Sequence, residues 1–364
     1  MPAGSWLRWA EMHLVGSPAA QSAGAVLAVP AVLALLGALA GCGSSAAPDD
    51  PTAARSGAAA PVASAASSSS AARPPTGVRP AAPAHPGTRG SAKPAAAPAS
   101  AACATAQSGS YTTSGVTYLL SVPTGAVTSA RPLPLVLSYH GYQQSAAAQE
   151  AYTGLGAYAA GHGAVVATLQ GAGGQWNFPR SAALRDDLAA SRAVVADVRS
   201  RLCGRVSGVG ATGWSDGADM ANLVACTGIA RAVVGVAPSI TPRGCSSWPP
   251  LTEVHGTADP FVPYGGGGGS RGGAFTGTEA QPALARVAAW ARSAGCGSSR
   301  SYRVGVDVAA QRWDGCDVRL YTVEGGGHTW PSRPGRDPVP GLGRTSTTLD
   351  TDALVVDILS GHAG

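Results

Sequence analysis

The chain has few charged residues. Only 12% of its 364 residues are Asp, Glu, Lys or Arg, about half of the roughly 25% typical of globular proteins. Aromatic residues are also scarce at 5%, whereas Gly (50) and Pro (28) are abundant. The shortage of charge is uneven, because residues 43–102 are almost wholly Ala, Pro, Ser, Gly and Thr. Only the part from about residue 104 has the apolar runs that build a core, and about 260 residues suffice for one α/β domain.

The sequence has no basic run with interleaved aromatic residues. Six of the 25 Lys and Arg and three of the 20 Asp and Glu lie in residues 1–103, so the folded region has a net charge near +2. A nucleic-acid partner is therefore disfavoured. The chain also has no internal repeat, which argues against a solenoid or a propeller. It has no CxxC or closely spaced Cys/His group, so we expect no metal site.

The apolar run near the N-terminus is too short for a comfortable membrane span. Residues 25–40 form a stretch of about 16 residues, below the roughly 20 of a spanning helix, and suit the apolar region of a signal peptide. The run ends in LAGC at residues 39–42, which resembles the bacterial lipobox, where the cysteine receives a diacylglycerol. We expect residues 1–41 to be a signal peptide and Cys42 to anchor the protein on the extracellular side of the membrane. A plain signal peptide or an uncleaved anchor is the alternative.

Residues 42–103 lack the apolar surface needed to offset chain entropy, so we expect a disordered tether before a catalytic domain at 104–364. Six cysteines follow Cys42, and an even number in an exported domain indicates disulfides. Six cysteines allow 15 connectivities. We favour Cys296 with Cys316, because they flank a short Gly/Ser-rich segment and the strand after it. The candidates are Cys103, Cys203, Cys226, Cys245, Cys296 and Cys316.

The folded region alternates two kinds of segment. Apolar runs rich in β-branched residues predict strands at 116–122, 135–139, 164–169, 206–212, 232–237, 251–255 and 318–323. Helical spacing predicts helices at 146–160, 184–202, 218–226, 281–294 and 349–359. Such alternation predicts an α/β fold with a mostly parallel sheet and helices on both faces. Functional residues are then expected at the carboxyl ends of the strands.

The segment GWSDG, residues 213–217, lies between a predicted strand and a predicted helix. A tight turn of this kind needs small residues two before and two after its serine, because side chains there would clash. The helix N-terminus favours an oxyanion next to Ser215, and the backbone N–H of Asp216 can point into it. The segment therefore predicts Ser215 as a nucleophile.

Two further loops carry an acid and a histidine. Asp259 follows the predicted strand 251–255, and a carboxylate there can hold the tautomer of a histidine. His328 follows the last predicted strand, after three glycines that let the loop bring its ring to the serine. The chain order Ser215, Asp259, His328 is the order of the α/β-hydrolases and differs from those of chymotrypsin-like and subtilisin-like enzymes.

The fourth loop contains His140, Gly141 and Tyr142, directly after an early strand. An HG pair at this point commonly shapes the second half of an oxyanion hole, with the backbone N–H of Tyr142 as donor. We interpret His140 as structural, because the fold analogy puts the working base on the loop of the last strand. His255 receives the same interpretation.

In four segments the sequence resembles the secreted polyhydroxybutyrate depolymerase and feruloyl esterase-type family of bacterial esterases, including actinobacterial lipoproteins. The segments are HGYQQ (140–144), GWSDGADM (213–220), HGTADPFVPY (255–264) and GGGHTWP (325–331). The resemblance spans residues 111–359. It implies an α/β-hydrolase fold, with Ser215 as nucleophile, His328 as base and acid, and Asp259 orienting it. The reaction would pass through an acyl-enzyme. No cofactor is implied.

Substrate contacts are less defined. Trp176, Asn177 and Trp330 are candidate walls of an acyl or aromatic pocket, together with Gln143 beside the predicted oxyanion hole. A tryptophan next to a glycine-rich loop can equally fill the core.

Three functions compete. The leading hypothesis is a membrane-tethered serine esterase acting on small-molecule or oligomeric carboxylic esters, of feruloyl, acetyl or hydroxyalkanoate type, as a monomer. An acyltransferase or peptidase on the same fold is the second, since an acyl-enzyme can pass to other acceptors. A surface binding module without catalysis is the third.

Overall fold

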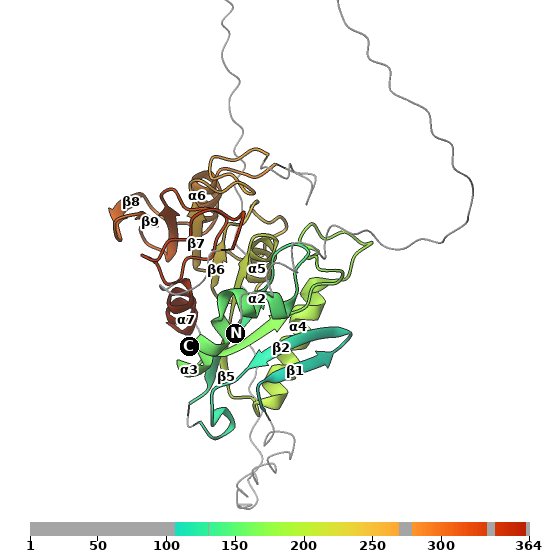
Figure 1. Cartoon of the computed structure of the whole chain (residues 1–364). Helices are drawn as coiled ribbons and strands as arrows, with labels where there is room; N and C mark the ends of the chain where they lie inside the picture. Colours follow the sequence, from blue (N-terminus) through green and yellow to red (C-terminus); the bar gives the residue numbers. More distant parts are fainter. Residues whose placement is uncertain (1–105, 130, 269–278, 333–338, 362–364) are drawn as a thin grey trace, which may run out of the picture. The chain divides into compact units, whose positions relative to one another are not determined.

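The computed structural model describes residues 106–129, 131–268, 279–332 and 339–361. The predicted signal peptide, Cys42, the tether and Cys103 lie outside these residues. The described part is built on a ten-stranded sheet of order β1-β2-β4-β3-β5-β6-β7-β10-β9-β8 (Figure 1). None of the helices in this part is both long and apolar enough to span a membrane.

The six central strands run parallel to one another. They are β4 (Val165–Leu169), β3 (Leu133–Tyr139), β5 (Val206–Trp214), β6 (Val233–Val236), β7 (Leu251–Gly256) and β10 (Val318–Val323). The outer strands pair antiparallel and are β1 (Gly109–Thr113), β2 (Val116–Ser121), β9 (Val308–Trp313) and β8 (Ser299–Arg303). The mostly parallel sheet confirms the prediction, and all seven predicted strands are present; β1, β8 and β9 were not predicted.

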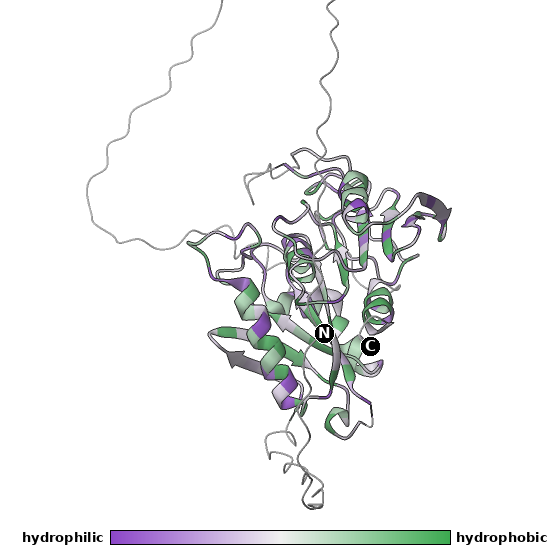
Figure 2. Ribbon diagram, turned by 180° about the vertical axis from the view of Figure 1, so that it is seen from behind, coloured by the Kyte–Doolittle hydropathy of each residue, from purple (hydrophilic) through white to green (hydrophobic). Residues whose placement is uncertain are grey.

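The central strands are buried on both faces, which explains why they read as continuous apolar runs. Leu135 and Leu137 of β3 pack into one core together with α4 (Asp187–Arg201), α5 (Asp216–Cys226) and α6 (Ala283–Ser293). Val136, between them, points into a second core with α3 (Leu155–Gly161) and α7 (Thr351–Gly361). Figure 2 shows hydrophobic and hydrophilic residues along α4, as expected for a helix with one buried side.

The helix predicted at 146–160 is in fact two helices. α2 (Ala146–Thr153) ends where Gly154 adopts φ 64°, and α3 starts directly after it. Glycine takes this left-handed conformation without a steric penalty, so it ends the first helix and redirects the chain. The other predicted helices are present, with ends shifted by a few residues.

Disulfides join two pairs of the predicted cysteines. Cys296–Cys316, the favoured pair, is confirmed, and Cys226 pairs with Cys245. Cys203 is disulfide-bonded as well. Cys226–Cys245 ties the end of α5 to the loop after β6, so it braces the helix that begins beside Ser215.

Candidate active site

Ser215 occupies the turn between β5 and α5. Its φ is 58° and its ψ is −126°, a strained conformation for a residue with a side chain. A Cβ on Gly213 would lie 2.2 Å from the carbonyl oxygen of Gly217, and a Cβ on Gly217 would lie 2.1 Å from that of Tyr139. The strand and the helix can therefore approach this closely only because both positions are glycine, as the GWSDG pattern predicts.

The backbone around Ser215 is held from two sides. Its N–H donates to the carbonyl of Val236 at the end of β6, at 2.8 Å, and its carbonyl accepts from Ala218 in the first turn of α5, at 2.8 Å. Asp216 is the first residue of α5, and an N–H in that position has no acceptor within its own helix. Such an N–H can serve an anion held beside the helix N-terminus.

The HG loop lies against the same turn. A Cβ on Gly141 would meet the indole of Trp214 at 3.1 Å, so the loop that carries Tyr142 packs onto the residue before Ser215. His140 is buried, and its Nε2 accepts the N–H of Gly171 at 2.9 Å while its Nδ1 faces the carbonyl of Gly141 at 2.8 Å. Burial lowers the pKa of His140 to about 4. The ring is thus neutral and committed to the backbone, in agreement with a structural role.

Asp259 and His328 meet through a direct hydrogen bond. Nδ1 of His328 lies 2.7 Å from Oδ2 of Asp259, and Oδ1 of Asp259 accepts the N–H groups of Phe261 and Val262 at 2.8 and 2.9 Å. Burial raises the pKa of Asp259, but hydrogen bonding and the charge of His328, aided by His255, outweigh it and leave the pKa below its ordinary value. Asp259 is therefore an anion at neutral pH, fixed in orientation by three donors.

The loop that carries His328 is held close to both β7 and a later segment. A Cβ on Gly256 would lie 2.3 Å from the carbonyl oxygen of Gly326, so the ends of β7 and β10 touch. The N–H of His328 donates to Leu342 at 2.7 Å, and that of Gly327 donates to Arg344 at 2.9 Å. These contacts leave the His328 loop little freedom to move away from Asp259.

Trp214 packs against the His328 loop and against α2. Its ring centroid lies 5.1 Å from that of His328 and 4.9 Å from that of Tyr152. The ring of Phe261 lies 5.4 Å from His328. Trp214 immediately precedes Ser215, so the histidine ring packs on the residue next to the predicted nucleophile. The sequence did not indicate Trp214 and Phe261 as ring contacts of His328, although both stand inside the motifs that predicted the site.

The predicted pocket walls Trp176, Trp330 and Asn177 are all buried. Trp176 is 3% exposed, and its indole N–H donates to the carbonyl of His140 at 2.7 Å. Trp330 is 1% exposed, and its indole N–H donates to Asp352 at 3.0 Å. Both indoles therefore fill the core and do not line a pocket, which was the alternative interpretation. They are buried and their N–H groups are hydrogen-bonded, so they offer no surface to a ligand. Asn177 is also buried, with its amide on the carbonyls of Ser181 and Arg185.

Gln143 is exposed and has φ 55°, with its N–H on the carbonyl of Gly174 at 2.8 Å. It therefore stays at the surface of the HG loop, next to Tyr142, where a ligand can reach it.

Two acids of α5 lie next to the predicted nucleophile. Burial and the nearby charge of Asp219 raise the pKa of Asp216 well above its ordinary value, and Oδ2 of Asp216 has no hydrogen-bond partner. Asp219 accepts the N–H of Ser239 at 2.9 Å and of Ile240 at 3.0 Å, and the hydroxyl of Ser239 at 2.7 Å. Asp219 thus ties α5 to the loop after β6.

Two curated relatives resemble the chain in sequence. The chain is 30% identical over 281 residues to "Putative esterase NocK" of Nocardia uniformis subsp. tsuyamanensis. The alignment covers 67% of this chain and 79% of the relative. The chain belongs to this esterase family. It is also 28% identical over 229 residues to feruloyl esterase B of Piromyces equi, covering 58% of this chain and 42% of the relative. The chain thus spans less than half the length of the fungal protein. No family model matches the chain.

Solved structures with a similar arrangement are more distant in sequence. An acetyl xylan esterase from Aspergillus awamori has a TM-score of 0.45 at 16% identity, covering 59% of this chain and 90% of that one. Est1E from Butyrivibrio proteoclasticus has a TM-score of 0.39 at 13% identity, covering 70% and 97%. The fold of this esterase is the α/β-hydrolase fold, with its loops at the carboxyl ends of parallel strands.

Proposed function

We propose that this member of the esterase family is a serine esterase in which Ser215 is the nucleophile, His328 the general base and Asp259 the residue that orients His328. The proposal rests above all on one arrangement: the ring of His328 is hydrogen-bonded to Asp259 on one side and lies against Trp214, the neighbour of Ser215, on another. Acyl transfer needs an acid that holds a base and a nucleophile, and here the acid–base pair packs on the residue next to a strained serine.

In the proposed reaction, the Nδ1–H of His328 donates to Asp259, which leaves Nε2 without a proton and able to accept that of the Ser215 hydroxyl. The serine oxygen attacks the ester carbonyl carbon, and the backbone N–H groups of Asp216 and Tyr142 stabilise the resulting oxyanion. The imidazolium then gives its proton to the leaving alcohol, and an acyl-enzyme forms. Water, deprotonated by His328, attacks the acyl group and releases the acid.

We propose carboxylic esters of feruloyl, acetyl or hydroxyalkanoate type as substrates, free or as part of an oligomer. Feruloyl esterase B, a relative at 28% identity, supports the first class. The half-buried ring of Phe261 beside His328 supports an apolar or aromatic acyl group at this site.

The experiment is hydrolysis of para-nitrophenyl esters of increasing acyl length by the full chain and by Ser215→Ala. Ser247→Ala, which also removes a serine hydroxyl of the folded part, is the matched control. We expect activity in the wild type and the control, and a loss of about 10⁴-fold or more in Ser215→Ala. A folded wild-type protein that hydrolyses none of the esters overturns the proposal.

We also propose that the protein works outside the cell, tethered through a lipid on Cys42. The disulfides Cys226–Cys245 and Cys296–Cys316 support export, because such bonds persist in oxidising compartments. Cys42→Ala is expected to move the protein from the membrane fraction to the medium. Retention of this variant in the membrane fraction would favour an uncleaved anchor.

A further inference from the structure

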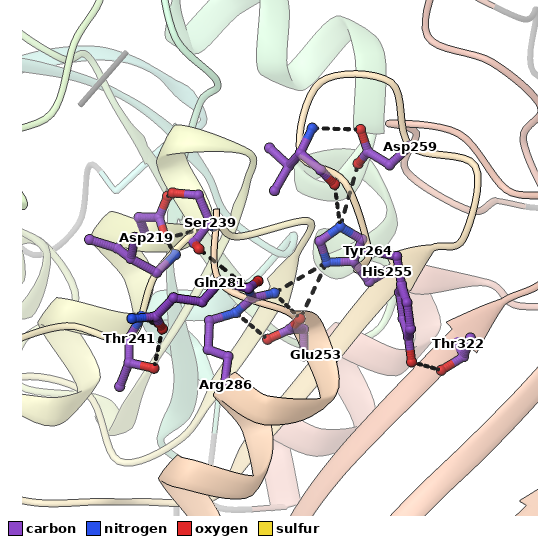
Figure 3. Close-up of polar contacts among 12 residues, drawn as sticks. Asp219, Ser239, Thr241, Glu253, His255, Asp259, Tyr264, Gln281, Arg286 and Thr322 are labelled. Atoms are coloured by element: carbon purple, nitrogen blue, oxygen red, sulfur yellow. Dashed lines mark hydrogen bonds and ion pairs between the residues drawn. The ribbon is translucent and has the colours of Figure 1, made fainter. Parts of the chain in front are cut away.

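Asp259 faces two histidines. Its Oδ2 lies 2.7 Å from Nδ1 of His328. The same oxygen lies 3.6 Å from Nε2 of His255, which comes from β7 (Figure 3). His255 is 1% exposed, so water does not replace it in this contact. The proposed reaction uses only the first of these two rings, and the second therefore needs an explanation.

The hydrogen bonds of His255 define where its proton is. Nε2 lies 2.9 Å from the carbonyl oxygen of Val262, and a carbonyl can only accept, so Nε2 carries the proton. Nδ1 lies 3.3 Å from Nη2 of Arg286, a donor, and 3.3 Å from Oε1 of Glu253, an acceptor. Nε2–H is therefore hydrogen-bonded to Val262, and Nε2 lies 3.6 Å from Oδ2 of Asp259.

Arg286 is itself held in place by the buried Glu253. Its Nη2 pairs with Oε1 of Glu253, and its Nε donates to Oε2 at 3.2 Å. The remaining nitrogen, Nη1, donates to the carbonyls of Gln281 at 2.6 Å and Ser239 at 3.3 Å. The ion pair joins β7 to α6. Because the charges of Glu253 and Arg286 compensate each other, Glu253 is stable as an anion without taking a proton from His255.

The other polar groups near His255 are hydrogen-bonded to further partners. Oε1 of Glu253 lies 3.3 Å from Nδ1 and is also paired with Arg286. The ring of Tyr264 stands edge-on to that of His255, with 5.7 Å between the ring centroids. The hydroxyl of Tyr264 is hydrogen-bonded to that of Thr322 instead. Asp219, which lies across Ser239 from Arg286, is bonded to Ser239 and Ile240 (Figure 3).

We propose that His255 is a positioning residue for Asp259: its Nε2–H, oriented by Arg286 and Glu253, stabilises the Asp259 carboxylate that holds His328. This inference rests on the proposed function. The effect of His255 on the charge of Asp259 agrees with the lowered pKa of that carboxyl group. Without His255, the Asp259 carboxylate would be a stronger base, would bind the proton of His328 more tightly, and would raise the pKa of the imidazolium.

Two amide variants separate this role from packing. The side chain of Gln can place an N–H near the position of Nε2, whereas Asn reaches only the position of Nδ1. We expect His255→Asn to lower kcat by about 10-fold to 100-fold with KM nearly unchanged, as for other partners of a functional histidine. It is also expected to move the acidic limb of the kcat/KM pH profile upward by roughly half a pH unit or more. His255→Gln should restore most of both.

Tyr264→Phe is the matched control, because it alters the ring packed on His255 without changing the donors to Asp259. It should leave the limb in place. In an Asp259→Asn background, the further change His255→Asn should alter kcat by less than about twofold, since its target is gone. A lower kcat with an unmoved limb, or equal effects of Asn and Gln, would mean that His255 only fills space and would overturn the proposal.

A readout without activity distinguishes this proposal from the proposed function. The ring carbon-bound protons of His328, assigned by their loss in His328→Gln, report its pKa by NMR in the full chain. The pKa should be higher in His255→Asn than in the wild type and in His255→Gln, whether or not the chain hydrolyses an ester. An unchanged pKa contradicts the inference, whereas an inactive wild type contradicts only the proposed function.

Discussion

Nδ1 of His328 lies 2.7 Å from Oδ2 of Asp259, and both side chains are almost fully buried. The two residues are far apart in the chain and meet because β7 and β10 are neighbours, with Val323 opposite Gly256 at the end of the pair. Oδ1 of Asp259 is occupied by two backbone N–H groups, so the carboxylate cannot rotate away from the ring. The tautomer of His328 is thereby fixed.

Asp259→Asn should lower kcat by about 10³-fold to 10⁴-fold, because the amide can stabilise the wrong tautomer of His328 and cannot balance the imidazolium. Asp314→Asn is the matched control, since Asp314 is a surface acid paired with Arg300. It should retain the wild-type kcat. Steady-state kinetics on a para-nitrophenyl ester measures both, and a loss of less than tenfold in Asp259→Asn would mean that another group holds His328.

Gly217→Ala should destabilise the fold by about 1 to 3 kcal/mol and abolish most activity, because the new methyl would lie 2.1 Å from the carbonyl oxygen of Tyr139. Gly161→Ala provides the comparison, since that position at the end of α3 has open space and an ordinary helical environment. Its stability should be unchanged or higher by up to about 1 kcal/mol. Urea unfolding of the two variants tests the difference, and equal stabilities would argue against the tight turn.

Asp219 should make stability depend on pH. Burial raises its pKa to about 6, partly offset by the hydrogen bonds of Ser239 and Ile240. In the unfolded chain the pKa is about 3.9, so folding favours the neutral form. That contribution is fully present below about pH 4 and is lost as the pH rises through about 6.

The wild type should therefore lose more stability between about pH 4 and pH 7 than Asp219→Asn, by on the order of 1 to 3 kcal/mol. The amide is neutral at every pH and can still accept the N–H of Ser239. Thermal midpoints over this range measure the two slopes, with Asp314→Asn as a surface control. Parallel curves for the wild type and Asp219→Asn would show that Asp219 does not carry this proton.

The two disulfides should contribute similarly to stability. Cys226–Cys245 and Cys296–Cys316 close loops of nearly equal length, with sequence separations of 19 and 20. Replacing either pair by alanine should cost about 3 kcal/mol. Intact mass should rise by about two daltons per bridge on reduction. No mass change on reduction would contradict the pairing, and a single double-Ala variant without loss of stability would contradict its contribution.

The elements that position the site were the easiest to predict from the sequence. The central strands are buried on both faces, so β3, β5, β7 and β10 appear in the sequence as apolar, β-branched runs. The predicted site residues follow each of these runs directly. In contrast, β8 has the sequence SRSYR with every residue exposed, and pairing along an edge leaves no apolar pattern to detect. The break at Gly154 was also missed, because a single glycine inside an alanine-rich segment does not by itself end a helix.

The side-chain network was harder to predict. The sequence places His255 next to the acid loop but does not show that Arg286, 31 residues later on α6, lies against its ring. Likewise, GGGHTWP suggests that Trp330 lies beside the substrate, whereas its side chain turns into the core toward Asp352. Such orientations depend on packing between distant elements, which no local pattern records.

The most direct test of the account is to trap the acyl-enzyme. The full chain is mixed with a slowly deacylating para-nitrophenyl ester, quenched in acid and analysed by intact and peptide mass. The account predicts one acyl group per molecule, on the peptide that contains Ser215, with a matching burst of nitrophenol and neither signal in Ser215→Ala. Turnover of the ester at an undiminished rate by Ser215→Ala, or an acyl group on a different residue, would contradict it.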